Sequence, residues 1–296
     1  MSLLSGLEEF GIKAVIDGEP VTGERLTYQP PKPGTPEEAE AEEKRIQESR
    51  AKEKELLLKR TARCPVCESE FKYLDIKSGR ARRIGSDMDL RPKFQGIDSL
   101  KYNFVSCPKC GYSALQNYFG HLSSLQIKLL KESICNDFKP KQSSQSDEYF
   151  TAYEDAVDYY KLAYYNTIVK KGAASEKAYT CLRTAWTLRG WRESITDETE
   201  EAAAFQKRCE AEEMEFYQKA FDGFLEAISS EMPPICGMDE PTLDFLVASM
   251  AFKLGKYDVA SKTVSSILTS RTASSKIKDR ALDLKSTIVE AIRGSK

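Results

Sequence analysis

Two short cysteine pairs constrain the fold of this chain more than any other feature of its sequence. Cys64-Pro65-Val66-Cys67 and Cys107-Pro108-Lys109-Cys110 share the Cys-x-x-Cys spacing, each with a proline after its first cysteine. Two intervening residues let a tight turn direct both sulfurs at one point, and the proline pre-sets the backbone for that turn. Two such turns supply the four thiolates of a closed tetrahedral site. We therefore predict a structural Zn²⁺ bound by Cys64, Cys67, Cys107 and Cys110.

The two pairs are separated by 39 residues, more than the ~15–20 of a compact zinc ribbon. Lengthening the loop to this extent costs only about 0.7 kcal/mol, whereas structural zinc contributes on the order of 10 kcal/mol. We interpret the intervening residues as an inserted hairpin. Gly111 follows the second turn, where a positive φ is easily adopted, and Glu68 has the same place after the first. Some backbone strain is therefore expected at Glu68.

A thiol-redox pair or an iron–sulfur cluster is the alternative use of these cysteines. A catalytic zinc usually has three protein ligands and one open position, which four cysteines would close. The chain has one histidine, His121, for which we expect a surface or capping role. No catalytic constellation is visible, so no enzyme is predicted. The other cysteines are expected to pack as small apolar side chains: Cys135, Cys181, Cys209 and Cys236.

Composition bounds the class of protein. Eight cysteines in 296 residues are too few for a disulfide framework and favour metal binding in a reducing compartment. A hydrophobic content of 41% excludes wholesale disorder. Acidic residues near the N-terminus do not resemble a signal peptide, and no apolar stretch reaches the ~20 residues of a membrane span. We expect a cytoplasmic protein that does not enter a membrane.

The cysteine segment is the only basic part of the chain. Residues 59–110 contain 12 basic and 6 acidic side chains, whereas the whole chain has a net charge of −2. Three cations are expected beside the thiolates: Arg60, Arg63 and Lys109. A second group, within residues 80–101, provides the alternative of nucleic-acid binding: Arg80, Arg82, Arg83, Lys93 and Lys101. The acidic sequence pI of about 5.8 weakens that alternative.

The block Asp87-Met88-Asp89-Leu90-Arg91-Pro92 lies between the cysteine pairs. Pairing of the two aspartates with Arg91 inside a stiffened hairpin is the simpler interpretation. The other interpretation is that these residues bind a ligand or a second cation.

Four regions follow from these changes in sequence character. They are an N-terminal segment with a Pro-rich linker (1–36), a charged helix (37–60), a zinc-binding β module (61–117) and a helical repeat-like domain (118–296). The predicted class is α+β, mostly α: a small zinc-bound β module followed by a tetratricopeptide-like helical array.

The array is predicted from a recurring pattern of alanine and larger apolar residues. It occurs three times, at Ala156/Tyr160/Ala163, Ala220/Phe224/Ala227 and Ala260/Val264/Ile267. The stretch from Pro241 to Ser274 resembles a tetratricopeptide repeat, with Gly255 between its helices. Spacings of three and four place Tyr179, Leu182 and Trp186 on one face of another helix. A generic helical bundle is the alternative.

Several motifs together resemble the bacterial family called domain of unknown function 2225. They are Cys-Pro-Val-Cys, the Asp87–Pro92 block, Tyr102, Cys-Pro-Lys-Cys-Gly-Tyr-Ser-Ala, the start Leu-Ser-Gly-Leu-Glu-Glu-Phe-Gly, and Ala185-Trp186 with Arg189. The resemblance implies a cytoplasmic zinc-knuckle and helical-repeat protein of bacteria, with no assigned reaction.

The resulting functional hypothesis is a non-enzymatic zinc-binding protein whose tetratricopeptide-like scaffold mediates protein–protein interaction. Its expected partner is a protein or peptide. The alternative is a nucleic-acid-binding zinc-ribbon protein that uses residues 80–101.

Overall fold

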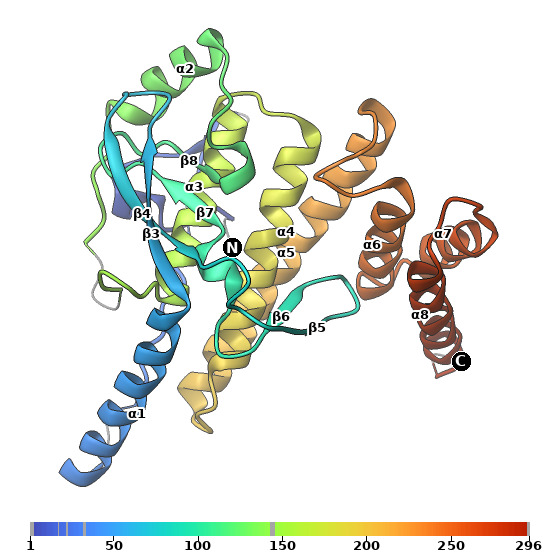
Figure 1. The fold of residues 1–296 in the computed structure, drawn as a ribbon, viewed down its shortest axis with the longest axis horizontal. Helices are drawn as coiled ribbons and strands as arrows, with labels where there is room; N and C mark the ends of the chain where they lie inside the picture. Colours follow the sequence, from blue (N-terminus) through green and yellow to red (C-terminus); the bar gives the residue numbers. More distant parts are fainter. Residues whose placement is uncertain (1–2, 17, 22, 32–33, 143–145, 295–296) are drawn as a thin grey trace.

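The fold is mostly helical, as predicted, and the four small sheets formed by the described residues lie in the first half of the chain (Figure 1). The computed structural model describes residues 3–16, 18–21, 23–31, 34–142 and 146–294. Helix makes up 56% of the structure, in eight helices over this described part, and each sheet has two strands. The predicted α+β, mostly α class is therefore confirmed. Part of the predicted Pro-rich linker, Lys32 and Pro33, lies outside the described residues.

The N-terminal segment buries the apolar side chains of its first turn. A 3₁₀ helix, η1 (Leu7–Phe10), ends at Gly11, whose φ of 72° is readily adopted by glycine. Leu4 and the two terminal residues of η1 are buried in the core. A short antiparallel pair follows, β1 (Val15–Ile16) and β2 (Glu19–Pro20).

Helix α1 (Pro36–Glu55) projects away from the rest of the molecule (Figure 1). A capping box between Thr35 and Glu38 begins it. It ends at Glu55, whereas the sequence predicted helix as far as residue 60. The helix ends early because of a tertiary contact. Residues Leu57–Arg63 form strand β3, which pairs along its whole length with β4 (Glu70–Ile76).

The β strands form three further hairpin units beyond the N-terminal pair, and two of them carry a cysteine pair in the turn. The elements in order are β3 and β4, β5 (Arg83–Ser86) and β6 (Pro92–Phe94), η2 (Ser99–Tyr102), β7 (Phe104–Ser106) and β8 (Ser113–Leu115), and η3 (Gln116–Tyr118). The β5–β6 hairpin extends towards α6 (Figure 1). We call residues 83–94 the arm.

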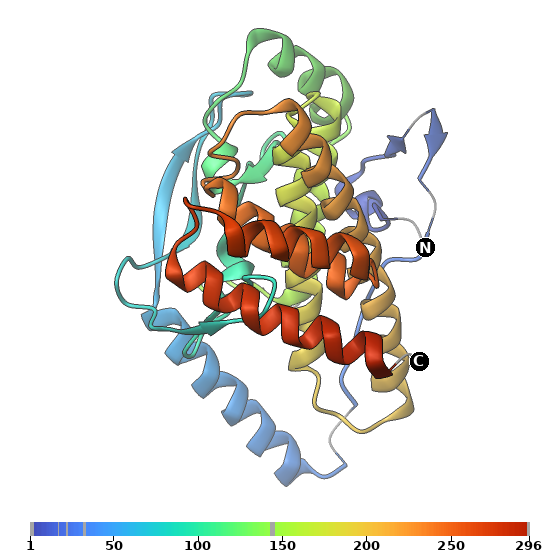
Figure 2. The ribbon, with the colours of Figure 1, turned by 90° about the vertical axis from the view of Figure 1, so that its right-hand side faces the viewer.

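The helices of the second half form two groups. The first comprises α2 (Ser124–Leu130), which continues into the π-helical turn η4 (Lys131–Cys135), α3 (Tyr153–Val169), α4 (Ala174–Ser194) and α5 (Glu200–Ser230). The second comprises α6 (Glu240–Lys253), α7 (Tyr257–Thr269) and α8 (Ser275–Gly294), which lie to one side of α4 and α5 (Figures 1 and 2). Helices α6 and α7 form the predicted hairpin, with Gly255 at a φ of 73° between them. Its membership of the tetratricopeptide class stays a prediction.

The core is continuous from the N-terminal segment to α8. All nine residues of the three alanine-based patterns are buried, as are Leu182 and Trp186. Cys64, Cys107 and Cys110 belong to the same core. No helix in the described ranges combines the length and the apolar character needed to cross a membrane.

Candidate metal centre

The two cysteine pairs lie in turns with the same backbone hydrogen bond. The amide of Glu68 donates to the carbonyl of Cys64 at 2.9 Å, and that of Gly111 donates to the carbonyl of Cys107 at 3.0 Å. Both donors have a positive φ, 61° for Glu68 and 74° for Gly111. The strain expected at Glu68 is therefore present, since a side chain with a Cβ disfavours this region.

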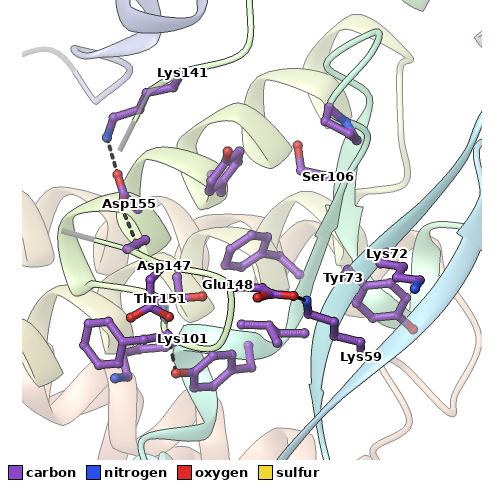
Figure 3. A pocket seen from close by; sticks show the side chains of 17 residues that line it. Lys59, Lys72, Tyr73, Lys101, Ser106, Lys141, Asp147, Glu148, Thr151 and Asp155 are labelled. Atoms are coloured by element: carbon purple, nitrogen blue, oxygen red, sulfur yellow. Dashed lines mark hydrogen bonds and ion pairs between the residues drawn. The ribbon is translucent and has the colours of Figure 1, made fainter. Parts of the chain in front are cut away.

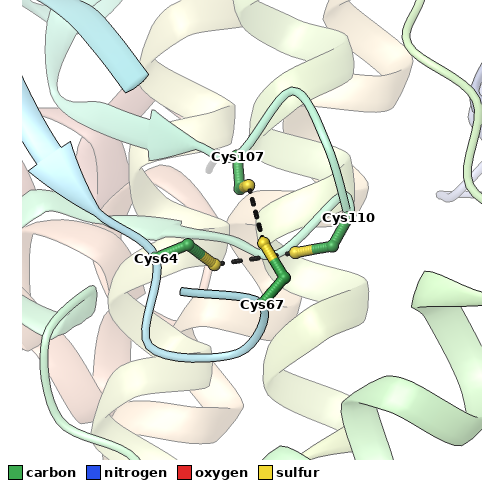
Figure 4. Close-up of side chains that lie close together, drawn as sticks. All are labelled: Cys64, Cys67, Cys107 and Cys110. Atoms are coloured by element: carbon green, nitrogen blue, oxygen red, sulfur yellow. Dashed lines mark hydrogen bonds between the residues drawn. The ribbon is translucent and has the colours of Figure 1, made fainter. Parts of the chain in front are cut away.

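The two turns bring all four predicted sulfurs together (Figure 4). The Sγ atoms of Cys64 and Cys110 lie 3.6 Å apart, as do those of Cys67 and Cys107. All four lie within 4.8 Å of one another. A tetrahedral ion with metal–sulfur bonds of ~2.3 Å requires sulfur–sulfur separations of about 3.8 Å. The four cysteines therefore fit a single four-coordinate ion.

Three of the four thiols shift one another's pKa values. Hydrogen bonds from Cys110 and then Cys64 hold the pKa of Cys107 well below its usual range. The hydrogen bond with Cys107 raises the pKa of Cys110 and raises that of Cys64 to about 12. Four negative charges this close together repel one another, which opposes ionisation of the whole cluster. A divalent ion at its centre is the charge that would allow all four sulfurs to bind as thiolates.

Ser69 is a polar neighbour of the sulfurs that the sequence did not single out. Its Oγ lies 2.9 Å from Sγ of Cys67 and 3.6 Å from Sγ of Cys107. Two of the cations expected beside the thiolates bind carboxylates instead. These pairs are Arg60 with Asp75 and Arg63 with Glu68, while Lys109 is exposed.

The second turn is packed against the helical half of the chain. A Cβ placed on Gly111 would lie 2.3 Å from the ring of Phe138, which itself stacks on Phe10. The Nδ2 of Asn166, on α3, donates to the carbonyl of Gly111 at 3.3 Å. The N-terminal segment, the metal centre and α3 therefore meet at one glycine.

One of the remaining cysteines also lies at this centre. Cys135, in η4, lies close enough to Cys110 for that thiol to lower the pKa of Cys135. It lies outside the set of four, and its separation in sequence from the two pairs concealed this contact. Cys181 and Cys209 are buried in the helical core, as expected. His121 is exposed, in keeping with a surface role.

A cleft of about 400 Å³ lies between the β3–β4 hairpin and α3 (Figure 3). Three of its lysines already have carboxylate partners: Lys59 with Glu148, Lys101 with Glu53, and Lys141 with Asp155. The cleft is therefore largely neutralised. Lys101 is only 6% exposed, which removes it from the surface predicted to bind nucleic acid.

The block from Asp87 to Pro92 forms the tip of the arm and the start of β6. Its internal pairing is confirmed for one aspartate, since Arg91 Nη1 lies 3.5 Å from Asp87 Oδ2. Arg91 also binds Glu193 at 2.8 Å. Asp89 differs from the prediction, because its carboxylate points out of the hairpin into the helices.

Asp89 is 4% exposed and accepts four hydrogen bonds. Arg189 donates two, at 3.1 and 2.8 Å, Trp186 Nε1 donates one at 3.1 Å, and the Tyr217 hydroxyl donates one at 2.9 Å. Burial alone would raise the pKa of Asp89, but the charge of Arg189 and these hydrogen bonds outweigh it and lower that pKa. The carboxylate is therefore held ionised inside the protein.

Comparison with known families agrees with the sequence motifs. The sequence model of a family described as an uncharacterized protein conserved in bacteria, DUF2225, matches residues 57–288. The match spans both cysteine pairs and the arm, and it ends within α8. No match was found among curated proteins or among solved structures.

Proposed function

The chain belongs to the uncharacterised bacterial family DUF2225, and we propose that it is a non-enzymatic zinc-binding protein that mediates a protein–protein interaction. The observation that carries the metal assignment is the closed set of four sulfurs. Bound there, the ion would supply a structural cross-link between the β3–β4 and β7–β8 hairpins. The soft thiolate set and its tetrahedral spacing favour Zn²⁺.

The absence of a free coordination position supports a structural role. Four cysteines complete a tetrahedral shell, so no position is left for water or a substrate. Among the residues that the structure describes, no other group of three or more histidine, cysteine or acidic side chains is arranged to hold a metal. Elemental analysis of the purified chain tests the identity of the metal. Iron with visible charge-transfer absorption would contradict zinc.

A second cleft supports the binding of a protein partner. It measures about 630 Å³ and separates α1 from the end of α4. Apolar side chains from both sides line it, among them Ile46 on α1 and Trp191 on α4, together with Phe150. Helix α1 has little packing of its own, and its exposed face is available for an incoming segment. A cleft of this size accommodates several side chains of a peptide.

Site-specific photo-crosslinking in the bacterial cell tests this interaction. A benzophenone side chain at Ile46 should give one discrete protein adduct, whereas the same group at Leu282, exposed on α8, serves as the control. No adduct at either position, together with monomeric migration of the native protein, would contradict the proposal.

Nucleic-acid binding is the weaker candidate. Arg80 and Arg82 are exposed and have no carboxylate partner within the described ranges. However, Lys93 binds Asp87 at 2.6 Å and Lys101 is buried. Affinity for a polyanion depends on several free cations acting together. Retention of the protein on RNA or DNA that falls steeply with salt would favour this alternative.

A further inference from the structure

The arm touches the helical half mainly through its tip. Asp89 enters the helices, Ser249 Oγ lies 3.3 Å from the Met88 carbonyl oxygen, and Arg280 binds Ser86. The other side of the arm faces solvent, with Ile84 61% exposed and Met88 42% exposed. Its two strands share only three paired positions, with an irregularity between the first two. The arm is therefore a small hairpin whose tip inserts one buried carboxylate into the helices, and its Arg91, 5% exposed, adds an ion pair with Glu193 of α4 at 2.8 Å.

The site that receives this carboxylate is built by α4 and α5 without help from the arm. Trp186 and Arg189 belong to α4, and Tyr217 belongs to α5. Arg189 Nε donates to the fully buried Glu213 of α5 at 2.8 Å, which orients the guanidinium. The remaining nitrogens of Arg189 face Asp89 as a planar fork, the geometry that binds a carboxylate in two places.

The receiving site is positively charged when the arm is left out of account. Arg189, Arg192 and Lys253 surround Glu213, and Glu210 approaches Arg192 at the exposed rim at 3.5 Å. Three cations therefore face two carboxylates. The charge that balances them comes from Asp89 of the arm, whereas Asp87, 3.3 Å from Arg189, is also paired within the arm with Lys93 and Arg91.

The site is also open to solvent beside the tip. A cavity of about 220 Å³ is lined by the arm on one side and by Arg189, Lys253, Ser249 and Phe252 on the other. An incoming carboxylate can therefore approach Lys253 and Arg189 before the arm has left.

We propose that the arm is a resident ligand of a carboxylate-binding site on the helical half, and that the same site takes an aspartate-bearing peptide of a partner protein when the arm leaves. This inference rests on the proposed protein-interaction function and specifies the chemical class of the ligand, a peptide that carries an aspartate. The arm competes at the high effective concentration of a tethered segment, so an external peptide binds well only when the arm is weakened or withdrawn.

The test supplies the arm to the full-length protein as a separate peptide. Asp89→Ala empties the site of its carboxylate, and the probe is a synthetic peptide with the sequence of residues 83–94, Arg-Ile-Gly-Ser-Asp-Met-Asp-Leu-Arg-Pro-Lys-Phe. We expect it to bind Asp89→Ala at least tenfold more tightly than the wild type. Replacing the second aspartate of the peptide by asparagine should weaken binding at least tenfold, because a charge-assisted hydrogen-bond pair is lost.

Asp222→Ala is the matched control variant. Asp222 is an exposed aspartate on α5, so its removal leaves the resident carboxylate in place and should give wild-type peptide binding. If Asp89→Ala keeps its native circular dichroism but does not bind the peptide more tightly than Asp222→Ala, the proposal is wrong.

Hydrogen exchange on the wild-type protein decides the matter if Asp89→Ala does not fold. A displaceable arm opens locally, so the amides of Asp87 and Leu90, bonded within the tip, should exchange at least tenfold faster than those at the centre of α4. Equal rates would mean that the arm leaves only on global unfolding, which overturns the proposal. Neither result bears on crosslinking at Ile46, so failure here is distinguishable from failure of the proposed function.

Discussion

Asp89 Oδ2 lies 2.8 Å from Nη2 of Arg189, although the two residues are 100 positions apart in the sequence. Asp89 belongs to the 39-residue segment between the cysteine pairs, and Arg189 belongs to α4. The segment whose ends meet at the cysteine cluster is therefore also bound near its middle to the helical half. This relationship underlies the first two of the following predictions.

Asp89→Ala is expected to lower the free energy of unfolding by about 3–5 kcal/mol, because it leaves a buried guanidinium without one of its carboxylates. Urea denaturation monitored by circular dichroism measures the effect. Asp222→Ala, at an exposed aspartate of α5, should change stability by less than about 0.5 kcal/mol. Similar midpoints for the two variants would show that the buried pair contributes little.

Acid should destabilise the protein partly through Asp89. Its pKa is lowered in the folded state, so its contribution to stability is fully present above the unfolded value of about 3.9. That contribution is lost as the pH falls from about 4 towards the folded-state pKa. Thermal melts at pH 6 and pH 3 should show a larger decrease for the wild type than for Asp89→Asn. Equal decreases in the melting temperature of the two proteins would mean that other groups cause the acid sensitivity.

Cys110→Ser or Cys64→Ser should remove most of the bound metal and unfold the segment from about residue 60 to 115, because each removes one of four sulfurs. The helices should keep most of their circular dichroism. Zinc content by elemental analysis, with about one ion per chain expected for the wild type, is the measurement. Cys135→Ser is the matched control and should retain the metal, since Cys135 lies outside the set of four. Unchanged zinc in Cys110→Ser would refute the assignment.

Gly111→Ala should destabilise the second turn by about 2–4 kcal/mol, because it combines a positive φ with overlap between its Cβ and Phe138. Gly79→Ala separates the two causes. Gly79 has a φ of 72°, and a Cβ added there would meet nothing within 4 Å, so only the backbone cost of about 1 kcal/mol should appear. Thermal denaturation of both variants gives the comparison, and equal losses would mean that Phe138 moves aside freely.

Ala260→Trp should destabilise the α6–α7 hairpin by about 1–3 kcal/mol or more, because Ala260 is fully buried and the larger ring overpacks the interface. Val259→Trp, at the neighbouring half-exposed position, controls for the substitution itself. A melting curve for Ala260→Trp that matches that of Val259→Trp would show that the packing between these helices is loose.

The cluster of four cysteines could be predicted from the sequence because the geometry of each turn is local. Two residues between cysteines, a proline and a following residue able to take positive φ are enough to shape each turn, whatever lies between the turns. The approach of Cys135 to Cys110 could not be found in this way, since it depends on how η4 packs against the second turn, and the same holds for the contact of Ser69 with Cys107.

The end of α1 shows the limit of local patterns. Residues 57–60 have a composition compatible with helix, and only pairing with β4 decides that they form a strand. Lys101 shows the same limit for charge, because a lysine in a basic stretch looks exposed until Glu53, on α1, covers it.

The sequence by itself therefore determined which four cysteines cluster, the mostly helical class and the buried alanine patterns of the helices, because turn chemistry and helical periodicity act over a few residues. Only the tertiary structure decided which partner each buried charge has. Asp89 could pair with Arg91 nearby or with any distant arginine, and the choice of Arg189 follows from the packing of α4 against α5, which places Trp186, Arg189 and Tyr217 around one point.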